Sequence, residues 1–253
     1  HTWDDLLPPL AEAGYRAVAP WMRGYPPTEI PADRDFSVAA LGRDVLRLAD
    51  ALEAERFTLI GHDWGASTVY QATALSPERV VALVAIAIPP LRALRPSLGA
   101  LWSLRHFMYY ALPLLPERHL RANNYAGVRA ICRRWSPGWT IPDDEFAHIV
   151  ASLDAPGGLE SALGYYRTFV RGALSAEAKE VRKAQGRRIS VPTLLIYGKD
   201  DIAAPFYSDS RALERSFAEG TSWTLCALDG GGHFIHREQP GAVAEAVLPF
   251  LAR

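Results

Sequence analysis

The sequence has few cysteines, no excess of charge of one sign and no long hydrophobic run. Its two cysteines, Cys132 and Cys226, form neither a Cys-x-x-Cys motif nor a cluster with histidine. This favours buried thiols in a reducing compartment, and so a cytoplasmic protein, over a disulfide framework. Lysine plus arginine (27) nearly balances aspartate plus glutamate (28), so no net field attracts nucleic acid or an anionic membrane. The longest apolar run, residues 80–88, is far shorter than the roughly 20 residues that cross a bilayer.

What is present is typical of a folded globular protein. Of the 253 residues, 49% are hydrophobic and 22% are charged, which allows a sizeable core. A neutral small molecule fits this charge balance better than a polyanion does. The chain begins at His1 rather than at a methionine, and residues 3–13 already have the apolar spacing of a helix, so we expect a further segment upstream. No secretory signal is visible.

Helical and strand-like segments alternate over much of the chain. We expect helices at residues 3–13, 37–55, 66–75, 208–218 and 241–251, and strands at residues 15–19, 57–60, 80–88, 192–197 and 223–228. This alternation predicts an α/β fold in which helices cover both faces of a mostly parallel sheet. It stops between residues 91 and 188, where the sequence is helical and rich in aromatic residues and arginine. We therefore assign residues 1–90 and 189–253 to one core and residues 91–188 to a helical insertion.

The strongest chemical signal is Gly61-His-Asp63-Trp-Gly65, placed where a strand ends and a helix begins. Two glycines allow the backbone to turn tightly, so the middle side chain, Asp63, projects at the carboxyl end of the sheet. This is the arrangement of a nucleophile elbow. The alternative is an aspartate that only caps an ordinary helix.

Two later residues strengthen the interpretation of Asp63 as a nucleophile. Asp201 follows the strand expected at residues 192–197, and His233 follows the strand expected at residues 223–228. The order nucleophile, acid, histidine is that of a hydrolase triad, and each member lies just past a strand. Asp200 and His236 are the nearest alternatives for the acid and the histidine.

Together with other motifs, this pattern resembles the α/β-hydrolase superfamily over nearly the whole chain. The motifs are Gly61-His-Asp-Trp-Gly65, Met22-Arg-Gly-Tyr25, Gly198-x-x-Asp201, and Gly232-His-Phe234 followed by Glu238-x-Pro240. They resemble in particular its branch of epoxide hydrolases and haloalkane dehalogenases. The resemblance implies an α/β-hydrolase fold, with residues 91–188 as a helical lid and no metal or organic cofactor.

The resemblance also implies a role for each member of the triad. Asp63 is expected to be the nucleophile, Asp201 the orienting acid and His233 the general base. A carboxylate is already ionised at pH 7 and can displace a leaving group from saturated carbon without the help of a base. The product is an ester of Asp63, and His233 would then activate the water that hydrolyses it.

Hydrolysis of that ester places negative charge on a carboxylate oxygen, which needs hydrogen-bond donors. The backbone N–H of Trp64 is expected to be one donor of this oxyanion hole. In proteins of this branch a second donor comes from a His-Gly-x-Pro loop, and this sequence contains none. We therefore expect about 30 to 40 residues, roughly three strands at usual lengths, to precede His1. The alternative is that the protein itself departs from the family and has no such loop.

The leaving group distinguishes an epoxide hydrolase from a dehalogenase. A ring-opened epoxide leaves as a basic alkoxide that needs a proton donor, whereas a halide needs only N–H donors. Tyr166, in Leu159-Glu-Ser-Ala-Leu-Gly-Tyr-Tyr166-Arg, resembles one of the ring-opening tyrosines of epoxide hydrolases. For a dehalogenase, the Trp64 indole would instead bind the halide with a second tryptophan of the lid. The candidates for that second donor are Trp102, Trp135 and Trp139.

The resemblance to epoxide hydrolases also implies a second ring-opening tyrosine, which in that branch precedes an aromatic-Gln-x-Pro stretch by a few residues. The corresponding segment here is residues 105–113, and it has no tyrosine at the expected spacing. Counting back from Pro113 gives His106, a one-residue gap gives Phe107, and Tyr109 lies about one helical turn away. A protonated His106 could replace the phenol as the proton donor.

The sequence thus predicts an epoxide hydrolase that acts on an apolar epoxide through an Asp63 ester and gives a diol. A haloalkane or haloacid dehalogenase is the alternative enzyme, and a hydrolase-fold protein that binds a small ligand is the alternative of another class. We expect no nucleic-acid or membrane partner, and the sequence allows a homodimer.

Overall fold

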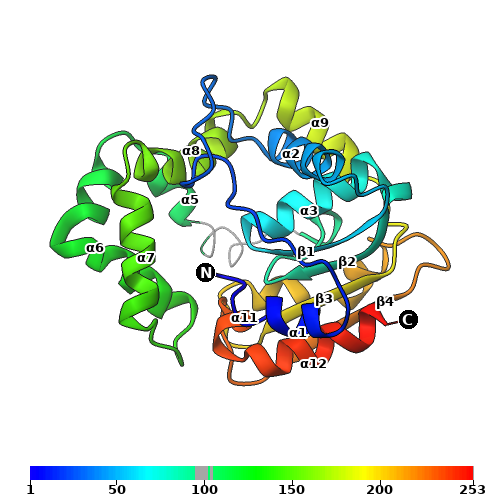
Figure 1. The fold of residues 1–253 in the computed structure, drawn as a ribbon. Coiled ribbons are helices and arrows are strands. Elements are labelled where there is room, and N and C mark those ends of the chain that lie inside the picture. The colour runs from blue at the N-terminus through cyan, green and yellow to red at the C-terminus, as the bar shows by residue number, and fades with distance from the viewer. Residues whose placement is uncertain (95–101, 103–104, 253) are drawn as a thin grey trace.

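A four-stranded parallel sheet organises the fold. The computed structural model describes residues 1–94, 102 and 105–252 (Figure 1). In this part of the chain the strands lie in the order β1-β2-β3-β4, and every neighbouring pair is parallel. They are β1 (Phe57–His62), β2 (Val80–Ile86), β3 (Thr193–Gly198) and β4 (Trp223–Leu228). The α/β fold with a parallel sheet, predicted from the alternation of helices and strands, is confirmed.

Helices cover both faces of this sheet, as Figure 1 shows. One face carries α2 (Val38–Ala51), α3 (Trp64–Leu75) and α9 (Ala176–Gln185), and the other carries α1 (Leu7–Glu12), α11 (Ile235–Glu238) and α12 (Pro240–Leu251). The remaining short helices of this part are η1 (Pro77–Arg79), η2 (Leu91–Ala93), η3 (Ala204–Tyr207) and α10 (Ser210–Glu214). The last is shorter than the helix expected at residues 208–218.

The alternation of side chains along the central strands explains the two covered faces. In β2, Leu83 and Ala85 belong to the apolar cluster that includes α3, whereas Val84 and Ile86 belong to the cluster that includes α1 and α12. All four are fully buried. A strand buried on both faces has a continuous apolar sequence, which is why residues 80–88 were recognisable as a strand.

The strand expected at residues 15–19 is wrong, because the structure has no strand there. The segment still alternates: Ala17 packs against the cluster that includes α1 and α12, while Val18 is 49% exposed. A strand also needs a neighbour for its hydrogen-bond ladder. Within the described residues, β1 ends the sheet and pairs only with β2, so residues 15–19 have no strand to pair with.

The described part of residues 91–188 lies between β2 and β3 and is largely helical, as expected. Beyond η2 and α9, their described helices are α5 (Arg105–Tyr110), α6 (Leu115–Trp135), α7 (Asp143–Asp154) and α8 (Gly158–Arg171). We call residues 91–188 the helical insertion. Its helices α5 to α8 lie to one side of the sheet (Figure 1) and pack around an apolar cluster of their own, which includes Phe146 and Leu163. The division into a core and a lid remains a prediction.

Two further observations bear on the expectations from composition. Cys132 and Cys226 are free thiols, the first buried and the second partly buried. None of the helices in the described residues is long and apolar enough to span a membrane.

Candidate active site

Asp63 lies at a strained turn between a strand and a helix. Strand β1 ends at His62, helix α3 begins at Trp64, and Asp63 between them has φ +52° and ψ −118°. This combination of angles lies outside the left-handed helical region, costs a non-glycine residue free energy, and is often found at active sites. The Oδ1 atom of Asp63 accepts a hydrogen bond of 2.7 Å from the backbone N–H of Trp64. Asp63 therefore caps α3 and also presents its carboxylate at the carboxyl end of the sheet.

The two glycines of the motif contribute differently to this turn. A Cβ atom on Gly61 would lie 2.4 Å from the backbone oxygen of Gly65 and 2.8 Å from the backbone nitrogen of Ala66. A Cβ atom on Gly65 would meet nothing within 4 Å. Close approach of β1 to α3 thus requires glycine at position 61 and not at position 65.

Gly61→Ala should therefore destabilise the protein, whereas Gly65→Ala should not. We expect the first change to lower the free energy of unfolding by about 1–3 kcal/mol, because the new methyl group meets rigid backbone atoms. The second should leave stability unchanged or raise it by up to about 1 kcal/mol, since alanine favours helix more than glycine does. Denaturant titration of both variants checks this. Equal stability of the two would contradict the packing described for Gly61.

The structure brings Asp63, His233 and Asp201 together in one chain of hydrogen bonds. Nε2 of His233 lies 3.0 Å from Oδ2 of Asp63, and Nδ1 of His233 lies 3.1 and 3.0 Å from the two carboxylate oxygens of Asp201. The Asp63 side chain is 29% exposed, whereas the side chains of His233 and Asp201 are 4% and 0% exposed. The backbone N–H of Ala203 also donates to Asp201 and fixes its carboxylate.

The electrostatics of this chain of hydrogen bonds keep Asp63 ionised and the His233 imidazole protonated. Burial alone would raise the pKa of Asp63, but the hydrogen bond and charge of His233 outweigh burial and lower it to about 2. Burial alone would lower the pKa of His233, but the charge of Asp201 and the hydrogen bonds to Asp201 and Asp63 raise it to about 10. The imidazolium between two carboxylates keeps Asp63 ionised, which is the form that can act as a nucleophile.

The alternatives to Asp201 and His233 lie elsewhere. Asp200 is exposed, and its backbone N–H bonds to Gly231. His236 is buried behind the triad, with its ring 4.3 Å from that of His62. Burial lowers the pKa of His236 well below its usual value, and the charges of His62 and His233 add to this effect.

Tyr166 lies beside the nucleophile on helix α8. Its ring meets that of Trp64 edge to face, with centroids 5.4 Å apart. Burial raises the pKa of the Tyr166 phenol well above its usual value, and the negative charge of Asp63 raises it further. A hydrogen bond with Trp64 acts in the opposite direction and lowers this pKa. The phenol therefore keeps its proton in the resting protein and can donate it to a basic alkoxide.

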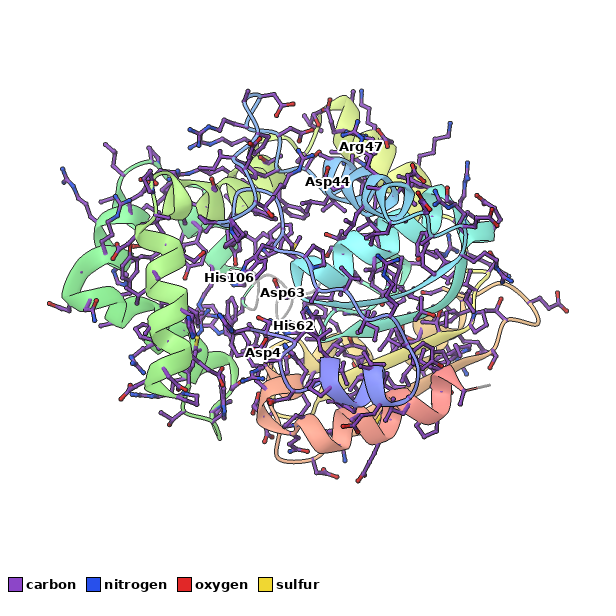
Figure 2. The ribbon with its side chains drawn as sticks, in the orientation of Figure 1. Asp4, Asp44, Arg47, His62, Asp63 and His106 are labelled. Atoms are coloured by element: carbon purple, nitrogen blue, oxygen red, sulfur yellow. The ribbon has the colours of Figure 1, made fainter. Side chains whose placement is uncertain are left out.

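Helix α5 brings two of the three other candidates to this site. His106 is buried, with its ring 5.9 Å from Tyr166, and Phe107 lies 5.0 Å from Tyr166 and 5.7 Å from Trp64. Tyr109 instead faces the interior of the helical insertion, with its ring 5.9 Å from that of His119. Figure 2 shows His106, Asp63 and His62 near one another where the helical insertion meets the sheet.

The three tryptophans of the helical insertion lie in different environments. Trp102 is 69% exposed and stacks under Arg105 at the surface. Trp139 is partly buried and packs 5.8 Å from Phe234. Trp135 is buried, and its ring lies 5.0 Å from that of His233.

Two residues of the site had no role assigned from the sequence. Nε2 of His62 bonds to the backbone oxygen of His233 at 2.9 Å and so helps to position the base. Burial and the charge of His233 lower the pKa of His62 to about 4. Tyr25 packs in the cluster that includes Trp64. Burial raises the pKa of the Tyr25 phenol most, and the negative charge of Asp63 raises it further. Both belong to recognisable motifs, but a motif does not say what a side chain touches.

The arrangement has the groups needed for covalent catalysis. It contains an ionised carboxylate, a backbone donor on one carboxylate oxygen, an imidazole on the other and a protonated phenol nearby. Over the described residues, no group of three or more His, Cys, Asp or Glu side chains is placed to hold a metal ion.

Comparison with known proteins identifies the family. A family model described as alpha/beta hydrolase fold matches residues 1–129. Epoxide hydrolase A of Mycobacterium tuberculosis is 28% identical to this chain, over 99% of the chain and 86% of the relative. The AB hydrolase superfamily protein YfhM of Bacillus subtilis is also 28% identical, over 98% of the chain and 85% of the relative. The crystal structure of epoxide hydrolase A from Mycobacterium thermoresistibile has the same fold, with a TM-score of 0.83 at 24% identity over 99% of this chain and 86% of that one. Since the family model matches more than half of the residues, this chain belongs to the α/β-hydrolase fold family.

Proposed function

We propose that this protein is an epoxide hydrolase that adds water to an epoxide through an ester on Asp63. The observation that carries the proposal is the hydrogen-bonded chain Asp63–His233–Asp201, with the Asp63 carboxylate beside the Tyr166 phenol. The two curated relatives described above support it, since one is named an epoxide hydrolase and both match almost the whole chain.

In the first step, Oδ2 of Asp63 attacks a carbon of the epoxide ring. The bond between that carbon and the ring oxygen breaks, and the oxygen takes the phenol proton of Tyr166, giving a hydroxyl group. Oδ1 of Asp63, held by the N–H of Trp64, becomes the carbonyl oxygen of the ester. His106 is buried within the same group of rings and is the candidate for a second donor to the epoxide oxygen.

In the second step, His233 acts as the base for water. Ester formation removes the charge of Asp63, which is one of the causes that raise the pKa of His233. The imidazole therefore releases its proton more easily after alkylation than before it. The Tyr166 phenolate, which gave up its proton in the first step, takes an equivalent proton back. Neutral His233 takes a proton from water, the water oxygen attacks the Asp63 carboxyl carbon, and the developing charge on Oδ1 faces the Trp64 N–H. As this intermediate collapses, the bond between the Asp63 carboxyl carbon and the diol oxygen breaks. That oxygen takes the proton of the newly added hydroxyl group, which releases the diol and restores the Asp63 carboxylate beside protonated His233.

Several properties remain predictions from the sequence. They are the absence of a metal or organic cofactor, an apolar epoxide as the substrate, a cytoplasmic location and a homodimer. Turnover of styrene-type and aliphatic epoxides, each paired with a matched haloalkane, tests the reaction itself. Measurable turnover of an epoxide would also exclude a protein that only binds a small ligand.

Tyr166→Phe should slow epoxide opening by about 10² to 10⁴, the range for loss of a positioned general acid. The change keeps the aromatic ring against Trp64 and removes only the proton donor. We expect the rate of Asp63 alkylation in a single turnover to fall by this factor, as measured by mass spectrometry of the intact protein.

Tyr165→Phe is the matched control, because the Tyr165 phenol donates to the backbone oxygen of Arg23 rather than facing Asp63. It should leave alkylation within about twofold of wild type, since only a structural hydrogen bond is lost. If Tyr166→Phe keeps more than about half of the wild-type alkylation rate, the epoxide mechanism is wrong, because such a loss corresponds to well under 1 kcal/mol of activation free energy. A dehalogenase would give that result, since a departing halide needs no proton.

A further inference from the structure

Trp135 lies directly beside the base of the triad, at the end of helix α6. The residue is 7% exposed, and its ring centroid is 5.0 Å from that of His233 and 5.0 Å from that of His106. The contact with His233 is edge to face, at an interplanar angle of 69°. Trp135 thus fills the space between the imidazole of the triad and helix α5.

Hydrogen bonds fix Trp135 to the loop that carries His233. The backbone N–H of His233 donates to the backbone oxygen of Trp135 at 2.9 Å. The next residue, Ser136, accepts from the N–H of Phe234 at 3.1 Å and donates to the carboxylate of Glu238 at 2.6 Å. A Cβ atom on Gly232 would lie 2.4 Å from Cα of Ser136, so the two loops touch. The indole therefore holds a set position relative to the imidazole.

The indole N–H of Trp135 is buried and has no hydrogen-bond partner among the described residues. Buried N–H groups are almost always paired, and a group left unpaired calls for a physical explanation. The fixed loops on either side argue against a ring that is free to turn toward an acceptor. A donor kept unpaired beside the base is suited to a partner that arrives during the reaction.

We propose that the Trp135 indole N–H holds the water that hydrolyses the Asp63 ester. The inference rests on the proposed function, since it assigns a donor to its second step. One lone pair of the water accepts from Trp135, the other attacks the Asp63 carboxyl carbon, and one O–H proton passes to Nε2 of His233. The water oxygen forms the new C–O bond as that O–H bond breaks, so atoms and charge balance.

The location of Trp135 favours this water over the epoxide oxygen as its partner. The ring of Tyr166, the donor to the epoxide oxygen, contacts that of Trp64. The ring of Trp135 instead contacts those of His233 and His106. Within the described part of the chain it makes no ring contact with Tyr166 or Trp64. A water within hydrogen-bond reach of His233 must lie against the groups that surround that imidazole.

Trp135→Phe tests the proposal, because it keeps an aromatic ring and removes the N–H. Alkylation of Asp63 and decay of the ester are followed separately in single turnovers with an epoxide that the wild-type protein hydrolyses. We expect alkylation within about twofold of wild type and ester hydrolysis slower by about tenfold, the size of one hydrogen bond. The ester should then accumulate in the steady state and appear in the intact mass. Normal alkylation also reports that the variant is folded.

Two further variants separate the N–H from the ring. Benzothienylalanine at position 135 keeps the shape of the indole with sulfur in place of N–H and should slow hydrolysis as Trp135→Phe does. Trp139→Phe is the matched control, because Trp139 packs on Phe234 and makes no ring contact with His233 among the described residues. It should hydrolyse the ester at the wild-type rate.

Three results would overturn the proposal. They are hydrolysis at the wild-type rate in both variants of Trp135, equal slowing of both steps, and slowing of alkylation alone, which would assign the N–H to the epoxide oxygen. If the wild-type protein forms no ester with any epoxide, the proposed function fails and this inference fails with it. An active wild type with unaffected Trp135 variants rejects this inference only.

Discussion

Asp63→Asn should abolish formation of the covalent intermediate and therefore all turnover. The change retains the shape of the side chain, and the amide oxygen can still accept from the Trp64 N–H as Oδ1 does now. It removes the charge that makes the carboxylate a nucleophile, and a neutral amide is far less reactive toward saturated carbon. The expected measurement is an unchanged intact mass after prolonged exposure to an epoxide that alkylates the wild-type protein.

The matched control is Asp200→Asn, because Asp200 is exposed and its side chain makes no contact with His233 within the described residues. This variant should keep wild-type activity. Since asparagine at position 63 can revert to aspartate by deamidation, the mass of the peptide that contains it must be checked. Multiple turnovers by a variant shown to retain asparagine would remove Asp63 from its proposed role.

The approach of Asp63, Asp201 and His233 was predictable because of one property of parallel sheets. Strands β1, β3 and β4 run in the same direction, so the residues that follow them meet at one edge. The apolar sequences of these strands and the polar residue after each are visible in the chain. The choice between Asp201 and Asp200 was open, since it depends on how one tight turn after β3 orients adjacent side chains.

The helical insertion was less predictable, because contacts between distant segments determine which side chains face the nucleophile. Sequence spacing left His106, Phe107 and Tyr109 as alternatives, and only the packing of α5 against α8 directs the first two toward Tyr166. From the sequence, Trp135 was only one of three tryptophans of the helical insertion that could bind a halide, with nothing to place it beside His233. Its position beside His233 follows from hydrogen bonds between residues about a hundred positions apart in the chain, for which the sequence has no local signal.

His233→Gln should allow alkylation of Asp63 and stop hydrolysis of the ester. Glutamine can still bond to Asp63 or Asp201, but it cannot take a proton from water, and only the second step needs a base. We expect one equivalent of epoxide to react, after which the intact mass should show enzyme plus substrate and turnover should cease. Alkylation itself should slow, since the charge of His233 helps to hold the pKa of Asp63 at about 2.

His236→Gln is the matched control for this prediction. His236 is buried near His62, but neither of its ring nitrogens has a partner among the described residues, so it contacts no member of the triad through a hydrogen bond. This variant should form and hydrolyse the ester, with any loss seen in stability rather than in the decay of the adduct. If His233→Gln turned over normally without an adduct while His236→Gln accumulated one, His236 would be the base. The chain of hydrogen bonds from Asp201 through His233 to Asp63 would then be structural only.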